Sequence, residues 1–361
     1  MDIKEKIKIL PSCPGVYLMK DSLKNVIYVG KSKNLKNRVS SYFQNSKSHS
    51  PKVIKLVQNL KDFEYIITDT EFEAFLLECE LIKKIKPAYN KQMKSPKSYC
   101  YIRINLNEKN PDILICNEHK SSDECIYFGP YTNKNTLRTA IQNIREYFKI
   151  ICNNNLQKTS SCINYSLGLC IGMCLNDTLK KQYIDILKRL IYLFNGTDKS
   201  ILTELELKML DASEKFDFET AAKYRDYIQA VNYLLNNVKV IKFVKENKNI
   251  VLLESLNDSV IKLFLINGNK ILFSEKYSMN DLNLEKLKLI IKNNISFCFN
   301  NENLKNPIEI GREEIDESQI IYTYLKNKSN NCKYFIVLER WLNTPDGYMN
   351  ILNELDKLIS I

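Results

Sequence analysis

Residues 15–43, GVYLMKDSLKNVIYVGKSKNLKNRVSSYF, contain two β-rich runs and a helical pattern in close succession. The runs at 15–19 and 26–30 are rich in β-branched and aromatic residues, and a hairpin-length connector separates them. From about residue 34 to residue 43, apolar side chains recur at helical spacing, at Leu35, Val39 and Tyr42. This order predicts a small α/β unit, which continues with a short helix at 52–60 and a third strand at 63–68.

An acidic helix is expected further along, in the segment TDTEFEAFLLECELIKKIKPAYN at 68–90. The pattern predicts a helix over 71–85 that is capped by Thr70. At 100° per residue its apolar side chains form one arc, at Ala74, Leu77, Leu81, Ile82 and Ile85. Glu78 lies near the middle of this arc. Because a buried carboxylate costs free energy unless a cation or hydrogen bonds satisfy it, Glu78 is either a structural salt-bridge residue or a metal ligand.

Composition excludes several classes of protein. The chain has 361 residues, of which 44% are hydrophobic and 26% charged, so disorder throughout and collagen-like repeats are excluded. No apolar run approaches the roughly 20 residues of a membrane span, and the N-terminus, MDIKEKIKIL, lacks the apolar block of a signal peptide. These features predict a cytoplasmic protein without membrane association, and the length suggests two or three domains.

Positive charge is concentrated near the N-terminus. The net charge is +11, and residues 1–100 contain nine more basic than acidic residues. Between residues 22 and 61 there are nine basic residues and no acidic one. Such a cluster is typical of proteins that contact a phosphate backbone. A solvated lysine-rich surface is the alternative, because the abundance of Lys, Asn, Ile and Tyr can also reflect genomic base composition.

Four regions follow from the pattern, and together they predict a multidomain α+β protein. Their bounds are 1–95, 96–200, 201–236 and 237–361. The second is expected to have strands at 99–105 and 113–116, a turn at YFGPYT (127–132), and helices at 136–148 and 177–194. The third is expected to be an antiparallel helical hairpin, with helices at 201–215 and 218–236. Strands are predicted in the fourth at VIKFV (240–244), IVLLE (250–254), VIKLFLI (260–266) and ILFSE (271–275), before mixed helices and strands.

Four of the eleven cysteines lie within 23 residues, spaced C-x9-C-x7-C-x3-C. They are Cys152, Cys162, Cys170 and Cys174. Four thiolates fit a tetrahedral zinc ion or an iron–sulfur cluster, and the spacing alone does not choose between them. Four buried free thiols are the alternative. An odd total of cysteines without an export signal argues against a disulfide framework.

The order of GVY (15–17), YVG (28–30), KSKNLKNRVSSYF and the acidic helix resembles the GIY-YIG nuclease domain of the UvrC family, the C subunits of the ABC excinuclease. This resemblance implies hydrolysis of a DNA phosphodiester, and it implies seven active-site residues. They are Tyr17, Tyr28, Lys31, Arg38, Tyr42, Glu78 and Asn90. Glu78 would hold Mg²⁺ or Mn²⁺, while Arg38 and Lys31 would meet the phosphate. Tyr28 is the first candidate for the general base and Tyr17 the second, although a phenol pKa near 10 would have to be lowered.

Two further segments resemble parts of the same family. The segment YFGPYT…REYFKIIC…SCINYSLGLCIGMC is similar to its cysteine-rich region, which favours a [4Fe–4S] cluster over zinc on the four cysteines. Its role would be structural or DNA-contacting. Residues 204–231 resemble the UVR motif, the helical hairpin through which the family meets UvrB. A hairpin that packs only onto its own chain is the alternative.

The resemblance to this family is strong up to about residue 235 and faint beyond it. Family members continue with an RNase H-like nuclease and helix-hairpin-helix motifs, and residues 237–361 contain no recognisable counterpart of either. The sequence therefore predicts a truncated excision-repair endonuclease that acts on damaged double-stranded DNA with UvrB and cuts only on the 3′ side of the lesion. The rivals are a non-enzymatic adaptor for UvrB and DNA, and a structure-specific nuclease independent of UvrB.

Overall fold

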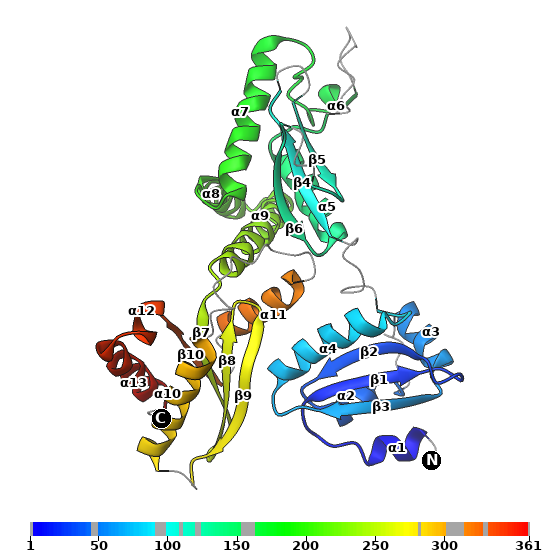
Figure 1. Cartoon of the computed structure of the whole chain (residues 1–361). Coiled ribbons are helices and arrows are strands. Elements are labelled where there is room, and N and C mark those ends of the chain that lie inside the picture. Colours follow the sequence, from blue (N-terminus) through cyan, green and yellow to red (C-terminus); the bar gives the residue numbers. More distant parts are fainter. Residues whose placement is uncertain are drawn as a thin grey trace. The chain divides into compact units, whose positions relative to one another are not determined.

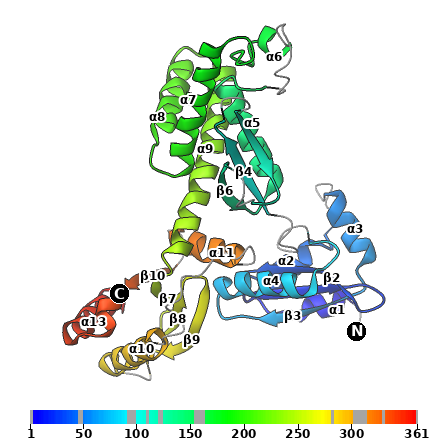
Figure 2. The ribbon, with the colours of Figure 1, turned by 45° about the horizontal axis from the view of Figure 1, so that its top comes forward.

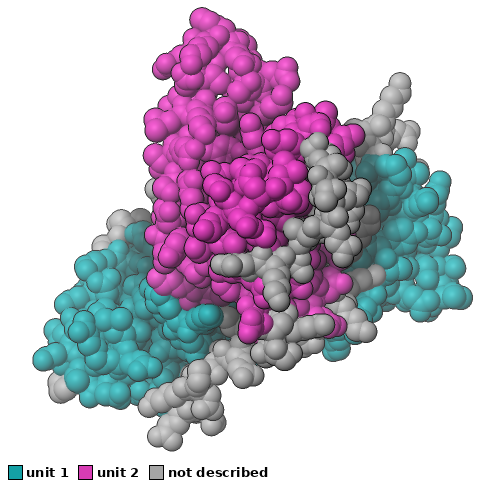
Figure 3. All heavy atoms as spheres, turned by 90° about the horizontal axis from the view of Figure 1, so that it is seen from above, with its two compact units in different colours: residues 1–96, 243–361 teal, residues 97–242 magenta. Residues whose placement is uncertain are grey.

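The computed structural model describes residues 3–44, 50–90, 99–107, 111–119, 124–152, 163–280, 283–300, 314–327 and 331–359. The chain divides into two compact units, coloured separately in Figure 3. One contains residues 1–96 together with 243–361, and the other contains residues 97–242. Helices and strands occur in both units, as expected of a multidomain α+β protein. No described helix is both long and apolar enough to cross a membrane.

The N-terminal part of the first unit is a three-stranded antiparallel sheet with helices on both faces (Figure 1). Its elements are α1 (Ile3–Lys8), β1 (Gly15–Lys20), β2 (Val26–Ser32), α2 (Leu35–Ser41), α3 (Pro51–Asn59), β3 (Asp62–Ile67) and α4 (Glu71–Ile85). The strand order is β2-β1-β3, so β2 is an edge strand. Every helix and strand expected in this region is present, with ends within about two residues of the expected ones.

Alternation along β1 explains the two faces of this sheet. Tyr17 and Met19 pack into one cluster, with residues of α2 and α3, whereas Val16 and Leu18 pack into another, with Ala74 of α4. The face that Tyr17 shares also contains the three residues predicted to line one side of α2, Leu35, Val39 and Tyr42, and all three are buried. The side chains of β1 are thus directed alternately toward α2 and toward α4.

Helix α4 starts as expected but packs differently. Thr70 and Glu73 form a capping box at its N-terminus. Of the predicted arc, Ala74 and Ile82 are buried, but Ile85 is 37% exposed. Phe72 and Cys79, which lie outside that arc, are fully buried instead. The single arc was therefore incomplete, because α4 packs against the N-terminal sheet on one side and against the C-terminal part of the unit on another.

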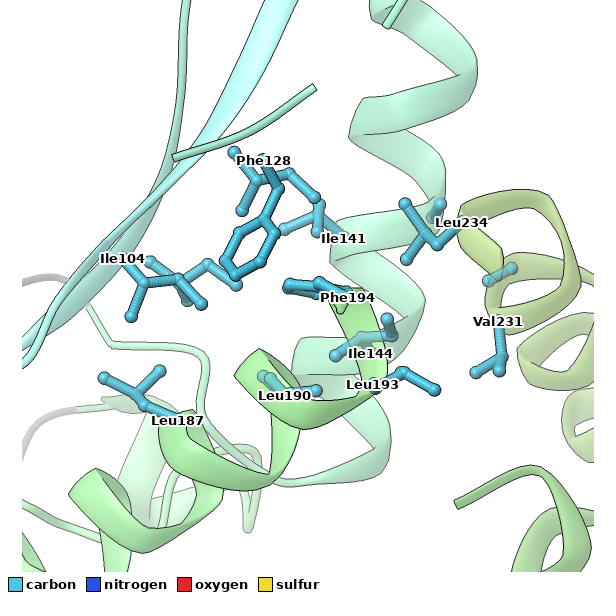
Figure 4. Close-up of a cluster of buried hydrophobic side chains, with 14 of the residues drawn as sticks. Ile104, Phe128, Ile141, Ile144, Leu187, Leu190, Leu193, Phe194, Val231 and Leu234 are labelled. Carbon is cyan, nitrogen blue, oxygen red and sulfur yellow. The ribbon is translucent and has the colours of Figure 1, made fainter. Parts of the chain in front are cut away.

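The second unit combines a three-stranded sheet with helices. Its elements are β4 (Cys100–Asn105), β5 (Asp112–Cys116), β6 (Ile126–Tyr131), α5 (Lys134–Tyr147), α6 (Ile163–Ser166), α7 (Asp177–Phe194), α8 (Ser200–Glu214) and most of α9 (Phe218–Lys245). Figure 4 shows the core, in which Phe128, Ile141, Phe194 and Leu234 meet from the sheet and three helices. The sheet order is β5-β4-β6.

Two expectations in this region were wrong. YFGPYT is not a turn but most of strand β6. Because β6 is an edge strand, Pro130 can occupy it without breaking a central ladder. VIKFV is not a strand but the end of α9, where Val240 and Val244 are buried four residues apart, as on one face of a helix. The preceding helix continues through this β-prone run, so tertiary packing overrides local propensity.

The C-terminal part of the first unit is a four-stranded antiparallel sheet covered by helices (Figures 1 and 2). Its elements are β7 (Asn249–Asn257), β8 (Val260–Asn267), β9 (Lys270–Ser278), α10 (Leu284–Phe299), α11 (Ile315–Lys326), β10 (Cys332–Val337), α12 (Glu339–Leu342) and α13 (Pro345–Ile359). The other three predicted strands are confirmed. Helices α10 and α13 pack in one core, whereas α11 and Phe72 of α4 pack in another.

Candidate active site

Three of the predicted tyrosines meet beside β1 and β2. Tyr17 on β1, Tyr28 on β2 and Tyr42 at the end of α2 have ring centroids 5.9 to 6.5 Å apart. The hydroxyls of Tyr17 and Tyr42 are hydrogen-bonded at 2.8 Å. Tyr17 and Tyr42 are buried, whereas Tyr28 is only partly buried. Tyr28 is therefore the member of this tyrosine cluster that a ligand can reach most directly.

Close packing around the cluster requires a glycine in β2. A Cβ atom on Gly30 would lie 2.3 Å from the hydroxyl oxygen of Tyr17, much closer than two such atoms can approach. Gly30 stands opposite Tyr17 in the β1–β2 register. The last residue of the YVG run is thus a glycine because the phenol of Tyr17 occupies the space of its side chain.

Two cations flank the tyrosines. The guanidinium carbon of Arg38 lies 5.1 Å from the ring centroid of Tyr42, and the Nζ atom of Lys52 lies 5.4 Å from that of Tyr28. Arg38 was expected, because it precedes Tyr42 by one helical turn. Lys52 on α3 was not among the predicted site residues. Its only sequence signal was its place in the basic stretch between residues 22 and 61.

The outer edge of β2 is bonded to two of the predicted residues. The side-chain amide of Asn90 accepts from the backbone N–H of Val29 and donates to its carbonyl, both at 2.9 Å. Glu78 Oε1 accepts the backbone N–H of Lys31 at 3.1 Å. Because β2 is an edge strand, its outward backbone groups need such partners. Glu78 and Asn90 are consequently held against the strand that carries Tyr28.

The side chain of Lys31 is directed along α4. Its Nζ atom lies 3.6 Å from Glu71 Oε1 and 3.2 Å from the ring centroid of Phe75. Neither Glu71 nor Phe75 was predicted to belong to the site. All seven predicted residues of the first domain are thus found around β2 and the tyrosine cluster, although their roles stay predictions.

Burial controls the ionisation of these groups. Burial raises the pKa of Tyr28, as do the nearby Tyr42 and Glu78, while Arg38 lowers it. The pKa of Tyr17 is raised well above its usual value by burial, then by Tyr42 and Tyr28. Burial likewise raises the pKa of the Glu78 carboxyl, against the lowering effects of Lys31 and Arg38. The phenols of Tyr17 and Tyr28 are therefore neutral near pH 7 in the free protein.

The residues around Glu78 fit a magnesium or manganese ion. Mg²⁺ typically binds one or two protein carboxylates and keeps several water molecules. Glu78 offers one carboxylate, largely desolvated, with one oxygen already oriented by the N–H of Lys31. A cation would offset the desolvation of this charge. The alternative, a plain salt bridge, has no support among the described ion pairs, which do not include Glu78.

The cysteine segment gives a different result. Cys170 is buried and lies in an isolated bridge with Ile150, while Cys152 and Cys174 are partly buried. Cys162 lies outside the described residues. Across the part of the chain that the structure describes, no three cysteine, histidine or acidic side chains form a group that could hold a metal ion. The three described cysteines therefore do not by themselves fit a cluster or a zinc ion.

The helical hairpin formed by α8 and α9 packs at its base and is exposed at its tip. Ile201, Leu205 and Leu234 belong to the core of the second unit. At the tip, Phe216 is 79% and Phe218 65% exposed, and their rings contact each other. The base of the hairpin thus packs onto its own unit, whereas its tip presents an exposed aromatic pair.

Three segments of the chain match known protein families. Residues 13–91 match the UvrC-like GIY-YIG domain, residues 99–193 the middle domain of the UvrC/Cho excinucleases, and residues 199–234 the UvrB/UvrC motif. The UvrABC system protein C of Clostridium perfringens (strain ATCC 13124) is 37% identical over 351 residues, which cover 95% of this chain and 55% of that protein. That of Alkaliphilus metalliredigens is 35% identical over 337 residues, covering 91% and 54%. The chain spans about half the length of these relatives.

Solved structures of the GIY-YIG N-terminal endonuclease domain of UvrC from Thermotoga maritima are also similar in sequence. The magnesium-bound form, in which magnesium is described as the catalytic divalent cation, is 40% identical. The match covers 25% of this chain and 96% of that domain, with a TM-score of 0.23.

Proposed function

The chain belongs to the UvrC family, and from this membership and the site geometry we propose that it is a metal-dependent DNA endonuclease of nucleotide excision repair. It nicks the damaged strand, on the 3′ side of the lesion, as part of a complex with UvrB. The observation that carries the proposal is the convergence of the three tyrosines, Arg38 and Glu78 around strand β2.

Each side chain has a defined task in phosphodiester hydrolysis. A divalent cation held by Glu78 would supply positive charge at the scissile phosphate and at the leaving oxygen. Arg38 binds a phosphate oxygen, because its guanidinium keeps its charge at any physiological pH. Lys52, above Tyr28, adds positive charge on the accessible side of the cluster. Asn90 does not need to touch DNA, since each of its polar atoms binds Val29 and positions β2.

Proton transfer is assigned to Tyr28, which would act as the base in its phenolate form: it first loses its own hydroxyl proton to solvent, and the phenolate then takes a proton from the attacking water. In the free protein the negative charge of Glu78 is one of the causes that raise the pKa of Tyr28. A divalent cation bound at Glu78 would offset this charge, and Arg38 also acts to lower the pKa of Tyr28, whereas burial, the largest cause, continues to raise it. Tyr17 is less suited to the task, because it is buried and its hydroxyl is bonded to Tyr42.

Recruitment is assigned to the exposed tip of the α8–α9 hairpin. Phe216 and Phe218 form an exposed aromatic pair, and such a surface is expected to be covered by a partner. The match of residues 199–234 to the UvrB/UvrC motif supports UvrB as that partner. The basic stretch between residues 22 and 61 supports DNA as the ligand of the N-terminal site.

The four-cysteine segment is proposed to hold a [4Fe–4S] cluster, with zinc as the alternative, only when Cys162 joins Cys152, Cys170 and Cys174. The family match of residues 99–193 supports the assignment. Absorbance near 400 nm of anaerobically purified protein, with iron and zinc analysis, decides between the two. Protein free of both metals would contradict a cluster of either kind.

The decisive experiment is a nicking assay with Glu78→Gln on a lesion-containing duplex loaded with UvrB. Glutamine keeps an oxygen for the N–H of Lys31 but removes the charge, so nicking should fall by at least about 10²-fold. Glu80→Gln is the matched control, because Glu80 is exposed on the same helix. Unchanged cutting by Glu78→Gln would refute its role as the metal ligand. Wild-type protein that never nicks, with or without UvrB, would favour the adaptor.

A further inference from the structure

Helix α4, which carries Glu78, has a second packed face in addition to the one against the N-terminal sheet. Phe72, Leu76, Cys79 and Lys83 lie four, three and four residues apart, so they form one stripe along α4. At 100° per residue, this stripe lies on the other side of the helix from Glu78. It contacts the C-terminal part of the same unit, whose role the sequence left open.

Phe72 anchors this stripe. It is fully buried in a cluster with residues of β7, β8 and α11. Its ring stacks on that of Tyr324 with centroids 4.6 Å apart, and meets Phe264 edge-on at 5.2 Å. An aromatic side chain of the nuclease domain thus completes the core of another part of the chain. Without residues 243–361 it would be exposed to water.

Ion pairs hold both ends of the helix. At the C-terminal end, Lys83 Nζ lies 2.6 and 2.7 Å from the carboxylate oxygens of Glu317 on α11. At the N-terminal end, Lys262 Nζ lies 2.7 Å from Asp69 and 3.0 Å from Glu73, the capping-box residue. Lys262 is only 6% exposed, so this pair is less screened than a surface one. Glu78 lies between the two sets.

We propose that residues 243–361 form a buttress that positions α4, and through it Glu78, for binding the divalent cation. Lys83–Glu317, Lys262 and the Phe72 contact act as positioning groups and do not touch the substrate. The proposal rests on the proposed function, because it takes Glu78 as the metal ligand. It predicts that weakening the buttress lowers metal affinity even though Glu78 and the tyrosine cluster are unchanged.

The test uses the full-length chain and the variant Glu317→Ala, with Glu339→Ala as control. Glu317 pairs with Lys83, whereas Glu339 is an exposed glutamate in the same part of the chain. Mn²⁺ binding is measured by electron paramagnetic resonance of the free ion, and α4 is followed by amide hydrogen exchange over residues 71–85. For Glu317→Ala we expect about fivefold weaker Mn²⁺ binding and faster exchange in α4. Nicking at saturating Mn²⁺ should stay within about twofold of wild type.

Lys83→Ala and the double variant of Lys83→Ala with Glu317→Ala show whether these two residues affect Mn²⁺ binding as one ion pair. The double variant should bind Mn²⁺ no more weakly than either single variant. Wild-type Mn²⁺ affinity in Glu317→Ala would overturn the buttress but leave the proposed function intact. Equal Mn²⁺ affinity of wild type and Glu78→Gln would instead overturn the proposed function, and this inference with it.

Discussion

Glu78 and Asn90, both proposed as site residues, also hold the edge strand β2. Glu78 accepts the backbone N–H of Lys31, and Asn90 binds the N–H and the carbonyl of Val29, so these outward groups of β2 have side-chain partners. Pairing such groups also protects the edge from joining another chain. The consequence is that the position of Tyr28 depends on two residues that come 50 or more positions later in the sequence.

We expect Asn90→Ala to destabilise the protein by about 1–3 kcal/mol, because both backbone groups of Val29 lose their buried partner. Nicking should fall as well, since β2 carries Tyr28. Urea unfolding followed by circular dichroism measures the first effect. Asn350→Ala, at an exposed position of α13, is the control and should remain within about 0.5 kcal/mol of wild type. Equal stability of the two variants would contradict a positioning role for Asn90.

Glu254 gives a prediction for pH. Burial raises the pKa of this carboxyl above its ordinary 4.5, although Tyr324 donates a hydrogen bond to it at 2.8 Å. The folded state therefore binds more protons than the unfolded state between the two pKa values, and stability falls as pH rises through the folded pKa. Glu254→Gln, which has no charge to bury, should melt at a higher temperature than wild type at pH 8.

This difference should vanish below about pH 4, where the carboxyl is protonated in both states. Thermal melts across about pH 3–8 provide the measurement. Glu339→Gln, at an exposed glutamate, is the control for the substitution itself. If the melting temperature of Glu254→Gln exceeds that of wild type by the same amount at every pH, the stabilisation comes from packing and not from the loss of an ionisable group.

Helix α4 packs two faces. Ala74 and Ile82 bury one against the N-terminal sheet, and Phe72 and Cys79 bury another against the C-terminal part. A helix that is apolar on two sides is typical of a buried position between layers. The Glu78 carboxylate reaches β2 along the first face, and the ion pairs flank the second.

Phe72→Ala should cost about 3–5 kcal/mol, the usual loss for removing a fully buried phenylalanine. Phe297→Ala is the matched control, because that ring is 85% exposed and should contribute less than about 0.5 kcal/mol. Chemical denaturation of both variants checks the difference. Equal losses would show that Phe72 is not buried against the C-terminal part in solution.

The basic excess and the exposed aromatic pair lie in different parts of the chain. The basic excess of residues 1–100 lies in the domain with the candidate active site, while the exposed aromatic tip lies on the α8–α9 hairpin. Catalysis and recruitment are thus assigned to different modules, and each should be removable without the other.

Replacing Phe216 and Phe218 together by serine should abolish UvrB binding without changing the melting temperature by more than about 2 °C, because both side chains are largely exposed. Pull-down with UvrB and UvrB-dependent nicking are the measurements. Phe297→Ser, which removes an exposed ring elsewhere, is expected to bind UvrB normally. Full UvrB binding by the double variant would place the partner surface elsewhere on the chain.

Local signals were sufficient for most helices and strands. The cap at Thr70, most strands of the three sheets and the hairpin near Phe216 depend on neighbours within a few residues, so the pattern predicts them directly. The motif order likewise indicated all seven residues that gather around β2. Local propensity predicted the wrong element where it competed with packing, as in the β-prone run that ends α9.

Only the tertiary structure revealed the second stripe of α4 and its contact with the C-terminal part. Phe72 and Tyr324 are separated by about 250 residues, and no periodicity links them. The same is true of Lys83 and Glu317, since each is an ordinary charged residue on its own helix until the fold places them 2.6 Å apart. The spacing of residues within a segment shows which face of that segment is apolar. It does not show what the face packs against, because contacts between distant residues leave no trace in local spacing. The packing partner is therefore decided only in the folded molecule.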